Sequence, residues 1–192
     1  HDILASVLLS AFADHAPIAR LALLPFDPPS VWQHLEHDEA DLALVTGMNL
    51  PEARRRPGFD EDFQVIQRKD HPRGDKPFTI DEFCALEHVL ISPEGGGFIG
   101  ATDKLLAEMG RSRRIACSLP SFLLAPALVS GSDLIALLPR RLAALHMDRV
   151  DCFDPPFASP RFSVDILWHP RRQNDPSHVW LRSLVARITA DL

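Results

Sequence analysis

Short apolar runs alternate with stretches of helical spacing along the chain. Apolar residues recur at helical spacing over residues 4–12, and this first helix is expected to end near Pro17. Residues 18–24 form a short apolar run that predicts a buried strand. Ser30 can cap a second helix, and residues 41–45 are a second short apolar run. The order expected from this part of the chain is therefore helix, strand, helix, strand.

The same alternation continues to the end of the chain. Further strands are predicted at 63–67, 88–91, 114–119, 134–138 and 163–169. Helices are predicted at 98–109, around 121–129, from Pro139 onward and at roughly 176–190. Short apolar strands separated by helices are typical of an α/β fold whose sheets are covered on both faces.

Size and charge narrow the classes of function. With 192 residues, of which 46% are hydrophobic, the chain can bury a core as one domain or as two small lobes. The formal net charge of −6 argues against nucleic-acid binding, because phosphate contacts need a basic surface. Residues 54–56 are a run of three arginines. Since Pro51, Pro57 and Gly58 surround that run, it is predicted to be a solvated loop.

The cysteines and the start of the chain bear on location. Cys84, Cys117 and Cys152 lie far apart with apolar neighbours, so we expect reduced core residues and a cytoplasmic location. No apolar run approaches the length that crosses a bilayer, and the start at His1 carries no signal-peptide pattern. The chain begins without methionine and runs directly into a helical pattern. We therefore expect that it is a piece of a longer protein.

The segment from Gly95 to Gly100 has the spacing GxGxxG between a predicted strand and a predicted helix. It matches a dinucleotide site weakly, because the next strand ends without an acidic residue for the ribose and Glu94 adds a negative charge beside the pyrophosphate. What remains is a glycine-rich helix start, whose free N–H groups and dipole favour an anion such as a carboxylate. A tight turn that needs flexible backbone explains the same glycines, and both interpretations stay open.

The histidines do not indicate a catalytic or metal site. His34 and His37 could place two imidazoles on one metal ion, but no third ligand is evident, so a solvated helix face is preferred. His169 is interpreted as a packed or hydrogen-bonded histidine at a strand end. The sequence holds no GxSxG, HExxH or GK[ST] motif. We therefore expect a binding module with no catalytic residue, no metal ligand and no cofactor.

Eight short segments form a recognisable series along the chain. They are EADLALV at 39–45, QRKDHP at 67–72, EHV at 87–89, PSFL at 120–123, GSDLIALLPRRL at 131–142, LWHP at 167–170, DP at 175–176 and WLR at 180–182. Taken in this order, they resemble the effector-binding (substrate-binding) domain of LysR-type transcriptional regulators. Each segment is weak alone, and the shared order carries the resemblance. The resemblance is strongest to the branch that contains nodulation and aromatic-catabolism regulators, and it covers nearly the whole chain.

The resemblance implies a type II periplasmic-binding-protein fold, in which two α/β lobes are joined by two crossover strands and an effector binds in the cleft. Lobe I would comprise residues 1–68 and 169–192, and lobe II residues 69–168. Two expected parts are absent from this chain. One is the winged helix-turn-helix with its linker helix, and the other is the first strand of lobe I, which would precede the helix that opens at Ile3.

The function implied by the resemblance is sensing of a small anionic molecule, with aromatic carboxylates as first candidates. The effector would control the conformation of a DNA-bound homodimer or tetramer, whose DNA contacts come from an N-terminal helix-turn-helix that this chain lacks. Leu9 and Phe12 are the candidates for a partner-facing side of the first helix. The alternative is a solute-binding protein of a transporter, which shares the fold and would carry a signal peptide. An enzyme that uses the glycine-rich turn for a cofactor is the third class.

The effector site is expected where strand ends and the starts of the following helices converge. Ser92 and the N–H groups of Gly96 and Gly97 could hold an anionic group. Ser121 could give a hydroxyl to the ligand or could merely cap its helix, and both interpretations stay open. The complete set of expected effector-binding residues is Thr46, Gly47, Met48, Asn49, Ser92, Gly96, Gly97, Phe98, Ser121, Phe122, Leu138 and Pro139.

Overall fold

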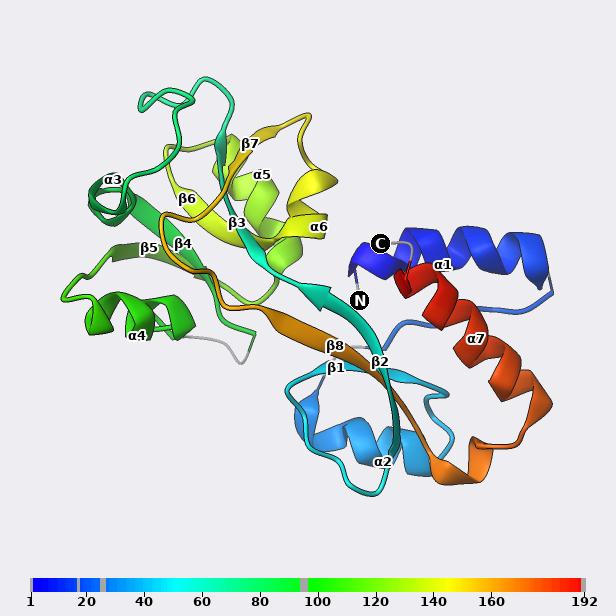
Figure 1. The fold of residues 1–192 in the computed structure, drawn as a ribbon. Coiled ribbons are helices and arrows are strands. Elements are labelled where there is room, and N and C mark those ends of the chain that lie inside the picture. Colours follow the sequence, from blue (N-terminus) through cyan, green and yellow to red (C-terminus); the bar gives the residue numbers. More distant parts are fainter. Residues whose placement is uncertain (1, 17, 25–26, 94–96, 191–192) are drawn as a thin grey trace. The chain divides into compact units, whose positions relative to one another are not determined.

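Two β-sheets organise the chain, one in each of its two structural units (Figure 1). The structure is a computed structural model that describes residues 2–16, 18–24, 27–93 and 97–190, with side chains described from residue 8 onward. Unit 1 comprises His1–Glu61 and Arg161–Leu192, and unit 2 comprises Asp62–Pro160. Both units combine a sheet with helices, so the α/β fold class predicted from the sequence is confirmed.

The sheet of unit 1 has three strands in the order β1-β8-β2. The central strand pairs antiparallel with both neighbours. The strands are β1 (Ala43–Thr46), β8 (Phe162–Trp168) and β2 (Arg54–Glu61). The helices of this unit are α1 (Asp2–His15), α2 (Val31–Glu36) and α7 (Pro176–Ala190), with short 3-10 turns η1 (Pro28–Ser30) and η3 (Pro170–Arg172).

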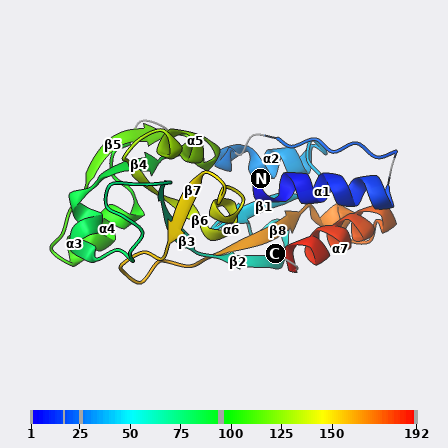
Figure 2. The same cartoon turned by 90° about the horizontal axis from the view of Figure 1, so that it is seen from above.

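Alternate residues of β8 serve two separate cores in unit 1, as the two-residue period of a strand requires. Ile166 and Trp168 pack on one side with residues of α1 and α7, and Leu167 packs on the other side with Val31 and Leu35 of α2. The helices α1 and α7 lie side by side in both views (Figures 1 and 2). The sheet of unit 1 is therefore covered on both faces.

One residue expected to face a partner lies in this core instead. The ring of Phe12 is 8% exposed and meets the ring of Trp180 edge-on, with 5.9 Å between centroids. Leu9, on the same helix, is 62% exposed. Phe12 therefore packs between α1 and α7, whereas Leu9 is exposed and remains the candidate for a partner contact.

The sheet of unit 2 has five strands in the order β5-β4-β6-β3-β7. The strand β4 runs parallel to β5 and β6, whereas β3 pairs antiparallel with β6 and β7. The strands are β3 (Phe63–Arg68), β4 (Glu87–Ile91), β5 (Arg114–Leu119), β6 (Ile135–Pro139) and β7 (Val150–Phe153). The helices are α3 (Ile80–Ala85), α4 (Ala101–Glu108), α5 (Ala125–Ser130) and α6 (Arg140–Ala144), with the 3-10 turn η2 (Phe122–Leu124).

The arginine run that was predicted to be a loop lies in a strand. Arg54, Arg55 and Arg56 belong to β2, and the guanidinium of Arg55 forms an ion pair with Asp165 of β8 at 3.1 Å. The pairing of β2 with β8 shifts register between Pro57 and Phe59. The loop prediction was wrong because an outer strand with a bulge tolerates proline, glycine and charge that a central strand would not.

The strand predicted at residues 18–24 is not formed. Ile18 lies in a turn and is 97% exposed, and residues 19–24 belong to no helix or strand. An apolar run becomes a strand only when another strand pairs with it, and among the residues that the structure describes the sheet of unit 1 consists of β1, β8 and β2. The sequence shows the apolar run but not whether a pairing partner is present.

The boundaries of the two units lie earlier in the chain than the lobe boundaries expected at 68 and 169. The structure changes unit between Glu61 and Asp62 and again between Pro160 and Arg161. The reason is strand pairing, because β3 pairs with β6 and β7 of unit 2, and β8 pairs with β1 and β2 of unit 1. A periodic pattern locates each strand but does not name its partner.

The cysteines are free thiols, but none is fully buried. Cys84, Cys117 and Cys152 all have intermediate exposure. Burial raises the pKa of the Cys84 and Cys152 thiols, which keeps them protonated. Core positions were expected, and the structure gives half-buried ones instead.

No helix among the described residues is both long enough and apolar enough to cross a membrane.

Candidate functional site

Three strand ends of unit 2 meet at one edge of its sheet. The parallel strands β4, β5 and β6 present their carboxyl ends there. The residues that follow these strands include Ser92, Ser121 and Arg140. The N–H of Ser92 donates to the carbonyl oxygen of Leu119 at 2.8 Å, which extends the pairing of β4 and β5 by one bond. The chain order thus brings the predicted serines to the same edge.

The glycine-rich segment approaches this edge closely at one point. A Cβ placed on Gly97 would lie 3.3 Å from the hydroxyl oxygen of Ser92, so Gly97 and Ser92 are neighbours. Phe98 follows with 58% of its surface exposed. Gly96, the other predicted N–H donor, lies outside the described residues.

The helix after the glycines begins later than expected. It was predicted to start at Phe98, but α4 starts at Ala101 with Gly100 as its N-cap. The side-chain oxygen Oδ2 of Asp103 accepts the N–H of Gly100 at 2.6 Å. A carboxylate of the protein itself therefore interacts with the start of α4. Gly97 precedes the helix, so an anion at Gly97 would not rest on the helix terminus.

Asp103 also pairs with a buried arginine. The guanidinium of Arg113 contacts the carboxylate of Asp103 at 2.8 Å and 3.1 Å, and the Arg113 side chain is 2% exposed. Burial alone would raise the pKa of Asp103, but the hydrogen bonds from Arg113 and from the Gly100 N–H outweigh it and lower the pKa. The carboxylate is thus held ionised.

His88 of β4 is the third member of this cluster. Its Nδ1 lies 3.3 Å from Nη1 of Arg113, and its Nε2 lies 2.7 Å from the carbonyl oxygen of Phe83. Burial, together with the charge of Arg113, lowers the pKa of His88 to about 4. The imidazole is therefore neutral near pH 7, with Nε2 donating to Phe83 and Nδ1 accepting from Arg113.

Ser121 acts as a cap. Its hydroxyl oxygen accepts the N–H of Leu123 at 3.2 Å at the start of η2. The ring of Phe122 lies 6.2 Å from the ring of Phe63, so this half-buried phenylalanine packs beside the carboxyl end of β6, where Phe63 pairs with Pro139. Because a hydroxyl can accept one bond and donate another, capping leaves the Ser121 O–H available to a ligand.

The other predicted site residues of unit 2, Leu138 and Pro139, lie at the carboxyl end of β6. Leu138 has no exposed surface and Pro139 is also buried, so both support the edge from within. Arg140 comes next, and its guanidinium binds Asp62 at 2.6 Å and Asp154 at 2.9 Å. The hydrogen bond with Asp62 raises the pKa of Arg140. This arginine is a cation beside the strand ends, and two carboxylates already neutralise it.

The four predicted residues of unit 1 form a turn after β1. Thr46 is the last residue of the strand, and Gly47 adopts a φ of +60°, which favours glycine. The carbonyl oxygen of Met48 accepts a hydrogen bond from Arg55, and its side chain packs against the core that contains Leu35. Asn49 is exposed. This turn is thus tied to unit 1 by Met48.

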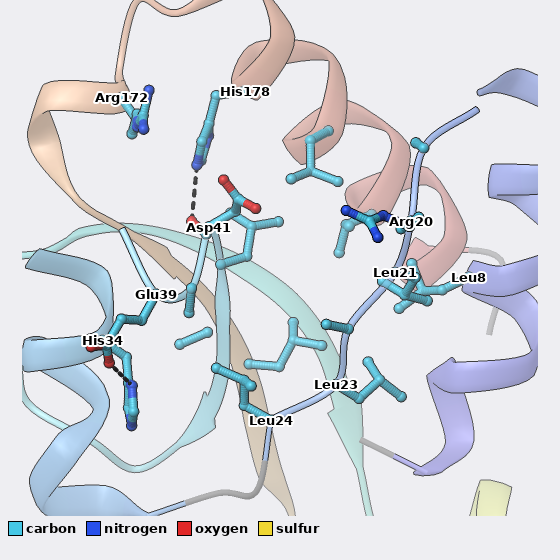
Figure 3. Close-up of a pocket in the computed structure, with 18 of the residues that line it drawn as sticks. Leu8, Arg20, Leu21, Leu23, Leu24, His34, Glu39, Asp41, Arg172 and His178 are labelled. Atoms are coloured by element: carbon cyan, nitrogen blue, oxygen red, sulfur yellow. Dashed lines mark hydrogen bonds and ion pairs between the residues drawn. The ribbon is translucent and has the colours of Figure 1, made fainter. Parts of the chain in front are cut away.

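A cavity that the sequence did not indicate lies within unit 1 (Figure 3). Its volume is about 530 Å³. Residues 19–24 form one of its walls, and the residues leading into β1 form another. Near one end, Nε2 of His178 donates to the carbonyl oxygen of Asp41, and Nδ1 of His34 binds Glu39 at 2.7 Å.

The other singled-out histidines have structural contacts. His34 pairs with Glu39, and within the described ranges no group of three or more His, Cys, Asp or Glu is placed to hold a metal ion. The ring of His169 stacks on Trp32, with 5.1 Å between centroids, and its Nδ1 accepts the N–H of Arg171. The prediction of a packed histidine at a strand end is confirmed for His169.

Sequence reasoning missed the cluster formed by His88, Asp103 and Arg113. One signal was present, because an acidic residue three positions after Gly100 is typical of a helix N-terminus. Nothing in the pattern links that residue to Arg113 or to His88. The contact depends on α4 packing back onto β4 and β5, which only the folded chain shows.

Known proteins match this chain over most of its length. A family described as the LysR substrate binding domain matches residues 3–189. The HTH-type transcriptional regulator SyrM of Rhizobium etli is 34% identical over 183 residues, which are 93% of this chain and 54% of the relative. The HTH-type transcriptional activator NagR of a Ralstonia species is 30% identical over 196 residues, 96% of this chain and 62% of the relative. The chain thus spans little more than half the length of these relatives.

A solved structure and a further relative agree with this assignment. Nodulation protein D 1 of Sinorhizobium fredii is 28% identical over 179 residues, covering 90% of this chain and 54% of the relative. The regulatory domain of MexT, a transcriptional activator in Pseudomonas aeruginosa, superposes with a TM-score of 0.82 at 25% identity, over 95% of this chain and 91% of that domain. The chain shares the type II periplasmic-binding-protein-like fold with this regulatory domain. Because the family match covers nearly the whole chain, the chain belongs to the LysR substrate binding domain family.

Proposed function

We propose that this chain is the effector-sensing domain of a LysR-type transcriptional regulator, and that it binds a small molecule without catalysing a reaction. The observation that carries the proposal is the family match over residues 3–189. The relatives SyrM, NagR and NahR are all named as transcriptional regulators or activators. Their names favour a cytoplasmic regulator over the solute-binding protein of a transporter.

In this proposal the DNA contacts of the whole protein lie outside the chain. The net charge of −6 suits a sensing domain better than a surface for phosphates. Full-length CbnR, which has been solved with its target DNA, superposes on this chain over 65% of its own length, with a TM-score of 0.72 at 17% identity. A homodimer or tetramer would carry the effector signal to the DNA-binding parts, and exposed Leu9 on α1 is the candidate contact.

The effector site is proposed at the edge of the unit 2 sheet where β4, β5 and β6 end. The hydroxyl groups of Ser92 and Ser121 would donate to a carboxylate, and the backbone at Gly97 lies against Ser92. Phe122 and the exposed Phe98 would cover an apolar ring. Since Asp103 already binds the start of α4, the serine hydroxyls rather than the helix terminus are the proposed anion donors.

Benzoate is a direct probe of this site, because it joins one ring to one carboxylate. Thermal unfolding and calorimetric titration should show that benzoate stabilises the protein and that benzamide, which lacks the charge, does so less. Removing the hydroxyl in Ser92→Ala should weaken benzoate about tenfold, the loss of one hydrogen bond to a charged group.

The matched control is Ser130→Ala, at the end of α5, whose hydroxyl donates to the carbonyl oxygen of Ala127. It should leave benzoate affinity unchanged. If Ser92→Ala and Ser130→Ala bind benzoate alike, the anion does not lie at this edge. If benzoate does not stabilise the wild-type protein at all, aromatic carboxylates are the wrong class, while the family assignment stands on its own evidence.

A further inference from the structure

Arg140 places a partly exposed cation at the strand edge of unit 2. It directly follows β6, and its side chain is 43% exposed. The strands β4 and β6 run parallel, with His88 opposite Ile135. Four residues further along each segment, Ser92 is level with Pro139, which directly precedes Arg140. Arg140 therefore lies at the same edge as Ser92.

The aromatic part of the proposed effector site lies beside the residues that hold this arginine. The ring of Phe122 is 6.2 Å from the ring of Phe63, and Phe63 pairs with Pro139. Asp62 directly precedes Phe63, and its backbone carbonyl oxygen accepts the N–H of Arg140 at 2.8 Å. A ligand ring packed against Phe122 is thus close to this segment, and a carboxylate on that ring is within reach of Arg140.

Two carboxylates hold the guanidinium of Arg140, and they do so unequally. Nε donates to Asp62 at 2.6 Å, and the Asp62 side chain is 25% exposed. Nη2 donates to Asp154 at 2.9 Å, and the Asp154 side chain is 78% exposed. An ion pair with such an exposed partner contributes little to stability, because water screens the charges and the side chains lose freedom. Asp154 is therefore the more readily replaced of the two partners.

The geometry of the guanidinium decides which partner a ligand would replace. The group carries five N–H donors, and its Nη1–Nη2 end can bind both oxygens of one carboxylate. Asp62 binds at Nε and not at that end, whereas Asp154 binds at Nη2. A ligand carboxylate that approaches the Nη1–Nη2 end would therefore compete with Asp154 and leave the bond to Asp62 in place.

We propose that Arg140 is a further ligand-binding residue of the effector site, and that the ligand's carboxylate displaces Asp154 from its guanidinium. The inference rests on the effector site proposed above and adds the cation of that site. Asp154 is then an internal competitor, which weakens the binding of every anion. It also favours carboxylates over neutral ligands, because a neutral group cannot replace the charge of Asp154 on Arg140.

Calorimetric titration of the 192-residue chain with benzoate tests the competition. Asp154→Asn removes the competing charge and should tighten benzoate binding about threefold, the scale of an exposed ion pair. Arg140→Gln removes the cation and should weaken benzoate binding about tenfold. In the Arg140→Gln background, Asp154→Asn should have no effect on affinity, because no cation is left for which Asp154 can compete.

The matched control for the change in charge is Asp151→Asn. Asp151 lies in β7 and pairs with Lys69 at 2.6 Å, so this variant removes the same charge without affecting a partner of Arg140. It should leave benzoate affinity unchanged. Arg140→Lys is the second variant should Arg140→Gln fail to fold. It keeps the charge but lacks the planar pair of donors, and it should weaken benzoate about threefold.

Carbon-13 NMR of protein labelled at the aspartate carboxyl carbons observes the displacement directly. Benzoate should shift the signal of Asp154 and leave the signal of Asp151 unchanged. In Arg140→Gln the signal of Asp154 should no longer respond to benzoate, since the ion pair is already absent. A change of charge alone, without competition for Arg140, would not produce this pattern.

The outcomes separate this inference from the proposed function. If benzoate binds, loses affinity in Ser92→Ala and is indifferent to Arg140→Gln and Asp154→Asn, the inference is overturned and the proposed site stands. Equal gains for Asp154→Asn and Asp151→Asn would also overturn it, because the net charge would explain both. If benzoate binds neither the wild type nor Asp154→Asn, the inference and the aromatic-carboxylate class both fail.

Discussion

The carboxylate of Asp103 binds the guanidinium of Arg113 through two contacts, at 2.8 Å and 3.1 Å, and the same carboxylate accepts the N–H of Gly100. One side chain thus joins the start of α4 to the residue that precedes β5. Because the Arg113 side chain is 2% exposed, its buried positive charge is stabilised by the carboxylate of Asp103 and not by water. This ion pair therefore ties the start of α4 to the segment that leads into β5.

Asp103→Asn is expected to lower the free energy of unfolding by about 3 kcal/mol, because it leaves the buried charge of Arg113 without a counter-ion. Urea unfolding near pH 7 would measure the loss. The double variant Asp103→Asn with Arg113→Met removes the charge as well, so it should recover much of the stability.

Asp133→Asn is the matched control for this substitution. Asp133 pairs with Arg68 at 2.7 Å, but its side chain is 62% exposed. An exposed pair contributes less than about 1 kcal/mol, so this variant should unfold nearly as the wild type does. Equal losses of unfolding free energy for the two variants would show that the burial of Arg113 does not determine how much its ion pair stabilises the protein.

Stability should fall as the pH is lowered from about 6.5 to about 4, and His88 should account for part of the fall. Burial lowers its folded-state pKa from 6.5 to about 4, so the unfolded chain takes up a proton in this range while the folded chain does not. The stabilising contribution is therefore fully present above pH 6.5 and is lost toward pH 4. A shift of this size corresponds to about 3 kcal/mol.

His88→Gln can test this account by urea unfolding at several pH values. Its stability should change less than that of the wild type between pH 6.5 and 4, even if it is lower at pH 7. Exposed His37, changed to Gln, should keep the wild-type pH dependence. If His88→Gln and the wild type lose stability in parallel, the imidazole of His88 is not the responsible group.

Gly58→Ala should destabilise unit 1 at the bulge between β2 and β8. The added Cβ would lie 2.7 Å from the carbonyl oxygen of Val164, so the strands must shift to admit it. Overpacking of this kind costs about 1–3 kcal/mol. Gly131→Ala is the control, because its Cβ would meet atoms no closer than 3.9 Å and it should change stability by less than about 0.5 kcal/mol. Thermal melts of both variants, compared side by side, decide the point.

Individual helices and strands were predicted from the sequence more accurately than the pairing of the strands and the packing between elements. The final helix was predicted at 176–190 and is found there, because an amphipathic stripe with a proline start marks both its period and its beginning. The strand β5 was also predicted with its observed bounds. In contrast, the helix α3 was missed although Thr79 and Glu82 form a complete capping box.

Errors arose where long-range pairing decides the local structure. Residues 18–24 have the composition of a strand but lack a neighbour, and β2 has the composition of a loop but pairs with β8. At the candidate site, the gathering of Ser92 and Ser121 at one edge followed from chain order. The ion pair of Asp103 with Arg113 did not, since it joins residues on two elements whose packing no local pattern specifies.

Ser121 offers the sharpest test of the candidate site, because its two roles require different chemistry. Its hydroxyl oxygen accepts the N–H of Leu123, so Ser121→Ala should lower stability by about 1 kcal/mol. Ser121→Asp keeps an acceptor for the cap and should retain stability, but it places a negative charge where a carboxylate ligand would bind. If the proposed site is correct, Ser121→Asp melts like the wild type and no longer binds benzoate. If Ser121→Asp both melts and binds like the wild type, Ser121 is a cap alone and the ligand lies elsewhere.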